Sequence, residues 1–235
     1  MASLYIVATP IGNLEDITLR ALRILKGVAV IFCEDTRHTK MLLEKFEIET
    51  QVMTLHEHSG TGSYHKVGSF LADGRDVAYV TDAGTPGISD PGGKLVEYVR
   101  NELDVSVQIV PVPGASALTT ALSVAGINLE RFVFLGFPPV KNKRVSYFRE
   151  LAEYEMPVVF YESTFRLLKS LRQLSEIDAS LSVIVCGELT KKFEKFFRGN
   201  IVQLLSRLEK ENLRGEFVII CYREREKEAW QYEQK

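Results

Sequence analysis

The chain has 235 residues, with 29 Lys and Arg against 31 Asp and Glu, so its formal net charge is −2. This balance excludes a strongly basic nucleic-acid coat and an acidic disordered tail. The length allows one large domain or two smaller ones, and the 46% of hydrophobic residues can build a sizeable core.

Short apolar runs alternate with helix-period segments in the first half of the chain. Helical spacing of apolar residues runs through Ile17–Leu25 and Met41–Phe46. The apolar runs predict strands at Leu4–Ala8, Val28–Cys33, Asp76–Thr81 and Val107–Val110. This alternation predicts an α/β domain with a mostly parallel sheet and helices on both faces.

The second half is less regular, and two of its strands follow one another around Thr190 without a helix between them. It is therefore expected to hold a mixed sheet with helices. We expect a first domain over 1–117 and a second over 118–235. The predicted strands are Phe132–Gly136, Val158–Tyr161, Leu181–Cys186, Phe193–Phe197 and Phe217–Tyr222, and the predicted helices are Arg144–Tyr154, Phe165–Leu174 and Ile201–Leu208.

The start of the chain has no basic segment typical of a secretory signal, and no apolar run approaches the roughly 18–20 residues that span a bilayer. Cys33, Cys186 and Cys221 are widely spaced and lie in apolar stretches. They are expected to be buried, reduced thiols of a cytoplasmic protein with no role for a membrane. No metal site is expected.

Four loops after the first-half strands carry the most specific residues. All four lie past the carboxyl ends of predicted parallel strands, so they should converge on one edge of the sheet. That edge is where open α/β sheets bind ligands. The loops are Thr9–Asn13, Glu34–Arg37, Asp82–Gly93 and Pro111–Ala117.

The third loop, Asp82–Gly93, has 12 residues that include four Gly, two Pro, two Asp and one Ser. Glycines let main-chain groups approach a ligand and prolines hold the loop's shape, which suits recognition of an adenine edge or a ribose. The alternative is a long turn with a helix N-cap at Ser89 or Asp90.

The fourth loop opens a predicted helix at Gly114–Ala117. Its small residues would let an anionic group, such as a carboxylate or phosphate, reach the helix N-terminus. The alternative is ordinary close packing of a helix on a sheet.

The second half holds two basic clusters and 19 basic against 16 acidic residues, whereas residues 1–117 hold 10 against 15. Basic residues among aromatics suit a phosphate backbone and splayed bases. The alternative is a solvated edge strand with core phenylalanines. The clusters are Lys141, Lys143, Arg144 and Arg149, and then Lys191, Lys192, Lys195 and Arg198, which are interleaved with Phe193, Phe196 and Phe197.

The segments Thr9–Leu22, Cys33–Leu43, Tyr79–Gly93 and Val110–Ala117 resemble the tetrapyrrole methylase superfamily. Within it they resemble a bacterial family that methylates the ribose 2′-hydroxyl of a cytidine in small-subunit (16S-type) ribosomal RNA near the decoding centre. The resemblance implies the two-domain tetrapyrrole methylase fold, S-adenosylmethionine in the cleft between the domains, and a homodimer. It also implies that the partner is this RNA within the assembled small subunit.

Carried over position by position, the resemblance also implies which residues bind the cofactor. These are Thr9, Pro10, Asp82, Ala83, Gly84, Thr85, Ile88, Ser89, Gly114, Ala115, Ser116, Ala117, Tyr161 and Leu189.

An alcohol is a poor nucleophile, so a base or a nearby cation should help to remove its proton. The candidate helpers are Asp35, Asp90, Glu162 and Lys191. Orienting the substrate, or forming an ion pair, is the alternative role of each.

The sequence departs from the family pattern in the second half, where Thr164 and Phe165 replace the usual Pro and His, and Gly187 replaces the usual Arg. These changes concern RNA contact more than cofactor binding. Two alternatives stay open: methyl transfer to a tetrapyrrole precursor, and a ribosome-assembly factor without catalysis.

Overall fold

The computed structural model describes residues 1–55, 60–103 and 106–224, and it divides into two compact units that meet in the sequence at Thr120 and Ala121. The division falls inside helix α5 (Ala117–Ser123), which the sequence-based boundary at 117/118 places almost wholly in the second domain. Among the described helices, none combines the length and the apolar character needed to cross a membrane.

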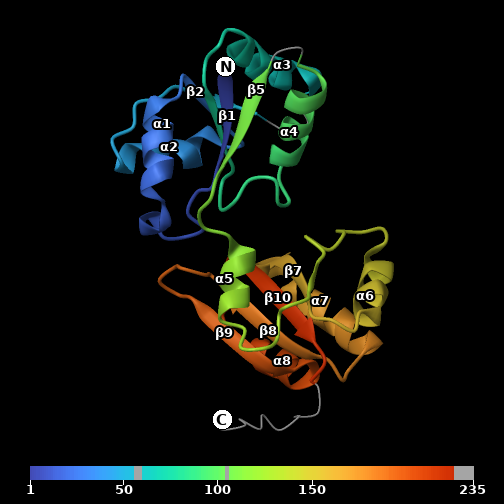
Figure 1. Cartoon of the computed structure of the whole chain (residues 1–235). Helices are drawn as coiled ribbons and strands as arrows, with labels where there is room; N and C mark the ends of the chain where they lie inside the picture. Colours follow the sequence, from blue (N-terminus) through green and yellow to red (C-terminus); the bar gives the residue numbers. More distant parts are fainter. Residues whose placement is uncertain (56–59, 104–105, 225–235) are drawn as a thin grey trace, which may run out of the picture. The chain divides into compact units, whose positions relative to one another are not determined.

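Unit 1 is built on a five-stranded sheet in which every neighbouring pair is parallel (Figure 1). The strand order is β3-β2-β4-β1-β5. The predicted parallel sheet is confirmed, with the short strand β3 as an unpredicted edge. The strands are β1 (Ala2–Val7), β2 (Val30–Cys33), β3 (Val52–Thr54), β4 (Val77–Val80) and β5 (Val107–Val112).

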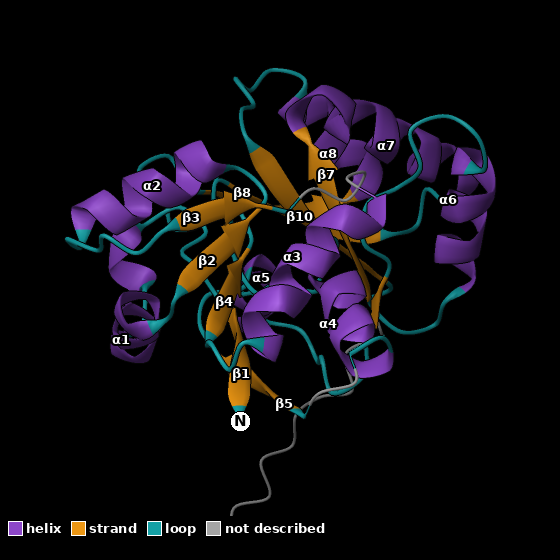
Figure 2. Cartoon of the chain, turned by 90° about the horizontal axis from the view of Figure 1, so that it is seen from above, coloured by secondary structure: helices purple, strands orange, loops and turns teal. Residues whose placement is uncertain are grey.

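Helices cover both faces of this sheet, as Figure 2 shows with α1 and α2 on one side and α3 and α4 on the other. Successive strand residues point to opposite faces, so Ile31 packs with Leu25 of α1, and Phe32 packs with Leu95 of α4. The helices are α1 (Leu19–Gly27), α2 (Thr36–Lys45), α3 (Gly60–Ala72) and α4 (Gly92–Asn101), with a 3₁₀ turn, η1 (Leu14–Asp16), before α1.

The sequence did not predict α3 or α4. Helix α4 begins with the pair Gly92 and Gly93, which have low helix propensity and mark a loop when they are read alone. The buried side chains of Leu95 and Val99 nevertheless hold the helix against the sheet.

Unit 2 contains a mixed five-stranded sheet in the order β6-β7-β10-β8-β9. The pair β6 and β7 is parallel and the other pairs are antiparallel, which confirms the predicted mixed sheet. The two successive strands predicted around Thr190 are the antiparallel pair β8 and β9. The strands are β6 (Val133–Phe134), β7 (Val158–Ser163), β8 (Ser182–Gly187), β9 (Lys195–Asn200) and β10 (Glu216–Tyr222).

Three helices pack on one face of this second sheet: α6 (Arg144–Glu153), α7 (Thr164–Ile177) and α8 (Ile201–Leu208). Phe148 of α6, Leu171 of α7 and Ile201 of α8 are fully buried against alternate strand residues such as Phe160 and Val185. Each unit therefore has its own core, and each positions its own set of loops.

Candidate functional site

The carboxyl edge of the unit 1 sheet brings together the four loops that the sequence singled out. We call these loops, 9–13, 34–37, 82–93 and 111–117, the unit 1 rim. Thr9 and Gly84 exchange two backbone hydrogen bonds of 2.9 and 3.1 Å between their amides and carbonyls. The Thr85 hydroxyl donates to the Ala115 carbonyl at 3.0 Å, and the Asp35 amide donates to Asp82 Oδ1 at 3.1 Å. The predicted convergence is confirmed.

Two glycines allow these loops to approach one another. Gly84 has φ +86°, and a Cβ there would lie 3.2 Å from a methyl of Ile11. A Cβ on Gly114 would lie 3.0 Å from the Cβ of Ala8. This contact agrees with close packing, the alternative role of Gly114, and a larger residue there would require Ala8, the residue after β1, to shift by a few tenths of an ångström.

Asp90 organises the third loop. Its carboxylate accepts hydrogen bonds from the amides of Gly87 at 2.8 Å, Ile88 at 3.1 Å and Gly92 at 2.7 Å. These bonds hold Ser89 in a left-handed conformation with φ 68°. The N-cap of α4 is Pro91, with no side-chain capping bond, so neither Ser89 nor Asp90 has the N-cap role that was the alternative interpretation of this loop.

The predicted cofactor residues of unit 1 fall into two groups. Thr9, Pro10, Gly84 and Ser116 are buried and support the rim; the Thr9 hydroxyl, for instance, donates to the Thr81 carbonyl at 3.2 Å. The others reach the surface: Asp82, Ala83, Ile88, Ser89 and Gly114 are exposed, and Thr85, Ala115 and Ala117 are half-buried.

The carboxylates next to the rim have different environments. Hydrogen bonds from Arg37, which also forms a 2.6 Å ion pair, lower the pKa of Asp35 to about 2. Glu34, one residue earlier, is half-buried, and its Oε1 accepts a hydrogen bond from Thr81 at 2.5 Å. Burial, and then the negative charges of Asp82 and Asp90, raise the pKa of Glu34. The sequence analysis placed Glu34 in the second loop but not among the candidate helpers, because its burial depends on packing beside Thr81, the residue after β4.

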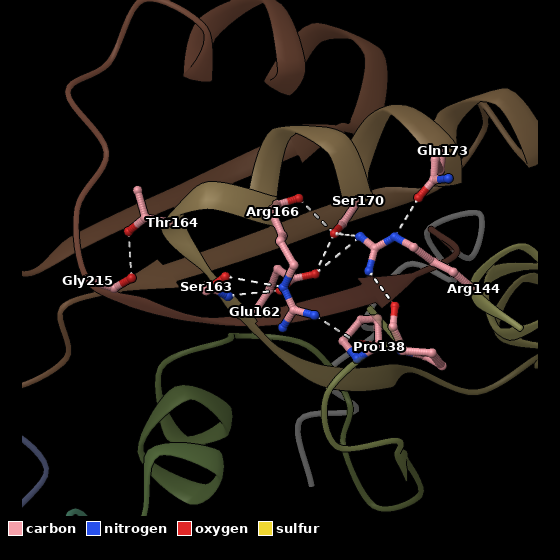
Figure 3. A network of polar contacts seen from close by, with 10 residues as sticks. Pro138, Arg144, Glu162, Ser163, Thr164, Arg166, Ser170, Gln173 and Gly215 are labelled. Atoms are coloured by element: carbon pink, nitrogen blue, oxygen red, sulfur yellow. Dashed lines mark hydrogen bonds and ion pairs between the residues drawn. The ribbon is translucent and has the colours of Figure 1, made fainter. Parts of the chain in front are cut away.

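In unit 2, Glu162 lies near the end of β7 and is completely buried. Its Oε1 pairs with Arg166 Nε at 2.7 Å, and its Oε2 accepts from Ser170 at 2.5 Å and lies 3.4 Å from Arg144 Nη2 (Figure 3). Both carboxylate oxygens are therefore engaged within the unit.

The other predicted residues of unit 2 lie on the same strand end and after β8. Tyr161 is half-buried, and its ring centroid lies 5.0 Å from that of Phe134 and 5.3 Å from that of Phe137. Leu189 is buried. Lys191 is exposed and forms a 2.8 Å ion pair with Glu188.

The second basic cluster is largely engaged within the protein. Lys195 forms a 2.7 Å ion pair with Glu211, and Arg198 donates to the Tyr222 hydroxyl at 3.1 Å and to the Ala125 carbonyl at 3.0 Å. In the first cluster, Lys141, Lys143 and Arg149 are exposed, while Arg144 is only 4% exposed.

The three cysteines are buried and unpaired, as expected. Over residues 1–55, 60–103 and 106–224, no three His, Cys, Asp or Glu side chains form a group that could hold a metal ion.

Comparison with known proteins shows which family the chain belongs to. The family model of the Tetrapyrrole (Corrin/Porphyrin) Methylases matches residues 3–205. The chain belongs to this family.

The chain is also similar to curated proteins named Ribosomal RNA small subunit methyltransferase I. It is 42% identical to the one from Bacillus subtilis (strain 168) over 94% of this chain and 75% of that protein. It is 40% identical to the one from Thermotoga maritima over 94% of this chain and 98% of that protein.

Solved structures with 15–16% sequence identity share the fold. The methyltransferase CobJ superposes with a TM-score of 0.71, with 15% identity over 95% of each chain. Uroporphyrin-III C-methyl transferase from Thermus thermophilus, in complex with S-adenyl homocysteine, gives a TM-score of 0.67 and 16% identity over 94% of this chain and 97% of that one. At these identities the likeness establishes the two-sheet α/β fold.

Proposed function

We propose that this protein transfers a methyl group from S-adenosylmethionine to the ribose 2′-hydroxyl of a cytidine in small-subunit ribosomal RNA. The observation that carries the proposal is the 40–42% identity, over 94% of the chain, to proteins named Ribosomal RNA small subunit methyltransferase I. Membership of a methylase family supports the same chemistry.

The unit 1 rim fits a nucleoside cofactor. Asp82, Ala83 and Ser89 are exposed there. Asp82 uses Oδ1 to accept from the Asp35 amide, and no described residue donates a hydrogen bond to its Oδ2. That oxygen is available to a ribose hydroxyl or an amine. When bound, S-adenosylmethionine supplies an electrophilic methyl group, and Tyr161 and Leu189 remain predicted contacts to it.

Glu34 is suited to take the proton from the substrate hydroxyl. Its Oε1 accepts from Thr81, and the Asp82 backbone also donates to the carboxylate, so its position is fixed. A general base works best when its pKa lies near the working pH, and burial raises the pKa of Glu34 in that direction. Asp35 is a weaker base, since Arg37 lowers its pKa to about 2.

The four helpers predicted from the sequence are each engaged with neighbours in a way that favours orienting roles. Asp90 holds the third loop, Glu162 is enclosed by Arg144 and Arg166, and Lys191 pairs with Glu188. Asp35 caps α2 by accepting from the Arg37 amide at 2.8 Å, and it can position Arg37 toward a phosphate.

We further propose that the substrate is the assembled small subunit, and that the protein acts in the cytoplasm as a homodimer. Sedimentation equilibrium of the purified protein tests the dimer. A sedimentation mass equal to that of one chain would contradict it.

The decisive experiment incubates purified protein with assembled small subunits and cofactor labelled in the methyl group. The proposal predicts label in the ribosomal RNA at one cytidine, in an alkali-stable dinucleotide that reports a 2′-O-methyl group. Label in a base would contradict the acceptor atom. No label in the RNA, beside an active relative as positive control, would contradict the proposal.

Two further arms separate the alternatives. Transfer of label to a tetrapyrrole precursor, with none to RNA, would support the tetrapyrrole reading. Subunit binding without measurable cofactor binding by calorimetry would support an assembly factor.

A further inference from the structure

A buried network in unit 2 joins one carboxylate to two arginines from different helices. Arg144, at the start of α6, is 4% exposed, and Glu162 of β7 is fully buried. The Ser170 hydroxyl of α7 accepts from Arg144 Nη2 at 2.5 Å and donates to Glu162 Oε2 (Figure 3). Arg144 Nε also donates to Gln173 at 2.8 Å.

Both arginines reach beyond the carboxylate to the same short loop. Arg166 Nη1 donates to the carbonyl of Pro138 at 3.2 Å, and Arg144 Nη1 donates to the carbonyl of Pro139 at 3.0 Å. Planar guanidinium groups can serve a carboxylate and a carbonyl at once, which an ammonium group does less well. The network therefore clamps two successive carbonyls.

Two further contacts fix the beginning of this loop. The Tyr161 amide donates to the Gly136 carbonyl at 2.9 Å, and the rings of Tyr161 and Phe137 lie 5.3 Å apart. We call residues 137–143 the Phe137 loop. Its course is set at four consecutive residues, Gly136 to Pro139, by partners on β7, α6 and α7.

The remainder of the Phe137 loop faces outward and is positively charged. Val140, Lys141, Asn142 and Lys143 are all exposed, and Phe137 is 44% exposed. Residues 136–149 contain four basic residues and no acidic one. Unlike the second basic cluster, Lys141 and Lys143 have no ion-pair partner among the described residues.

A buried ion pair contributes little to stability compared with an apolar replacement, because the charges lose their hydration. A role in shaping the loop explains why Arg144 and Glu162 are buried here and why Arg166, which is half-buried, pairs with them. We propose that the Phe137 loop is a contact surface for the phosphate backbone of the substrate RNA, and that Arg144, Arg166 and Glu162 are positioning residues that hold it in shape. This inference rests on the proposed function.

The first test concerns the clamp and needs no substrate. Limited digestion with trypsin, followed by mass spectrometry, measures cleavage after Lys141 and Lys143 relative to cleavage after Lys26 and Lys45, two exposed lysines of unit 1. E162Q should raise the relative rate at the loop at least tenfold. The matched control is E209Q, which removes the charge from a glutamate in an exposed ion pair with Arg172. It should leave the ratio unchanged.

A second variant keeps the test decisive if E162Q does not fold. Arg166→Lys retains a positive charge for Glu162 but cannot also hold the Pro138 carbonyl. It should open the loop to trypsin, and raise the KM for small subunits at least fivefold, with kcat and the cofactor Kd within twofold of wild type. A merely structural role would lower kcat and cofactor binding together. An unchanged cleavage ratio in folded R166K would overturn the clamp.

The RNA contact is tested separately with K141A/K143A, measured as binding to small subunits at several salt concentrations. Loss of two phosphate contacts should weaken binding about tenfold or more, and lower the slope of log affinity against log salt by about 2. The control K45A/K66A removes two exposed lysines of unit 1 and should change neither quantity.

The outcomes distinguish this inference from the proposed function. If wild-type protein labels the RNA and K141A/K143A binds subunits like wild type, the contact surface is wrong and the function stands. If wild-type protein leaves the RNA unlabelled, the function fails, whatever the trypsin result.

Discussion

The unit 1 rim and the Phe137 loop of unit 2 are shaped by different means. In the rim, Asp90 accepts from three backbone amides that lie within three residues of it in the sequence. In unit 2, Glu162 pairs with Arg144, 18 residues before it, and with Arg166, four residues after it. These two arginines donate to the carbonyls of Pro139 and Pro138.

Carboxylates can therefore serve to hold a loop in shape. Asp90 and Glu162 were both candidate helpers from the sequence. The carboxylate oxygens of Asp90 accept from backbone amides of its loop, and those of Glu162 pair with arginines that hold a loop. Glu34 differs from them, because burial raises its pKa.

The largest expected effect is on catalysis at Glu34. Glu34→Gln should lower kcat about 10²–10⁴-fold, the usual contribution of a general base. In wild-type protein the rate should fall as the pH drops below the pKa of Glu34, which lies above its usual value because the group is partly buried. The acid limb of the pH–rate profile should disappear in the variant.

The control for this prediction is Glu44→Gln, which changes an exposed glutamate of α2 and should keep the wild-type profile. A Glu34→Gln enzyme with wild-type kcat would place the base elsewhere.

The next effect concerns the stability of unit 2. Glu162→Ala leaves two arginine charges at the network without their partner, so it should lower the free energy of unfolding by about 3–5 kcal/mol in denaturant titrations. Glu209→Ala breaks a largely exposed pair and should cost about 0–1 kcal/mol. Equal losses of unfolding free energy in the two variants would show that the buried network stabilises unit 2 no more than the exposed ion pair does.

A smaller effect is expected at the rim. Asp90→Asn turns an amide NH₂ toward at least one backbone amide, and it loses hydrogen bonds to a charged acceptor worth about 1.5–3 kcal/mol. Calorimetry should show cofactor affinity reduced about tenfold or more. Asp73→Asn, at an exposed aspartate before β4, should bind like wild type. Unchanged affinity in Asp90→Asn would show that the cofactor does not need this loop.

Smaller changes in stability are expected when alanine replaces either of two glycines. A Cβ on Gly187 would lie 2.5 Å from Cε1 of Phe217, so Gly187→Ala should cost about 1–3 kcal/mol of stability. Gly93, in α4, has nothing within 4 Å of its Cβ position, and Gly93→Ala should raise stability by about 0.5–1 kcal/mol. Thermal unfolding measures both, and a stabilised Gly187→Ala would show that Phe217 moves aside easily.

Much of unit 1 followed from sequence alone. Apolar runs alternating with helix-period segments indicated a parallel sheet, and a parallel sheet requires that the loops after its strands share an edge. The Thr9, Asp35, Asp82 and Gly114 loops are bonded there as expected. The sequence also indicated the mixed sheet of unit 2, because two apolar runs around Thr190 have no helix between them, and these runs are the antiparallel strands β8 and β9.

The environments of the acidic residues depend on the tertiary structure. Glu34 and Asp35 are adjacent in the sequence, yet burial beside Thr81 raises the pKa of one and Arg37 lowers the pKa of the other. Glu162 acquires its partners from two helices, with Arg144 in α6 and Arg166 and Ser170 in α7. Burial and long-range pairing depend on how the elements pack, and the pattern of residue types along a chain does not encode them locally.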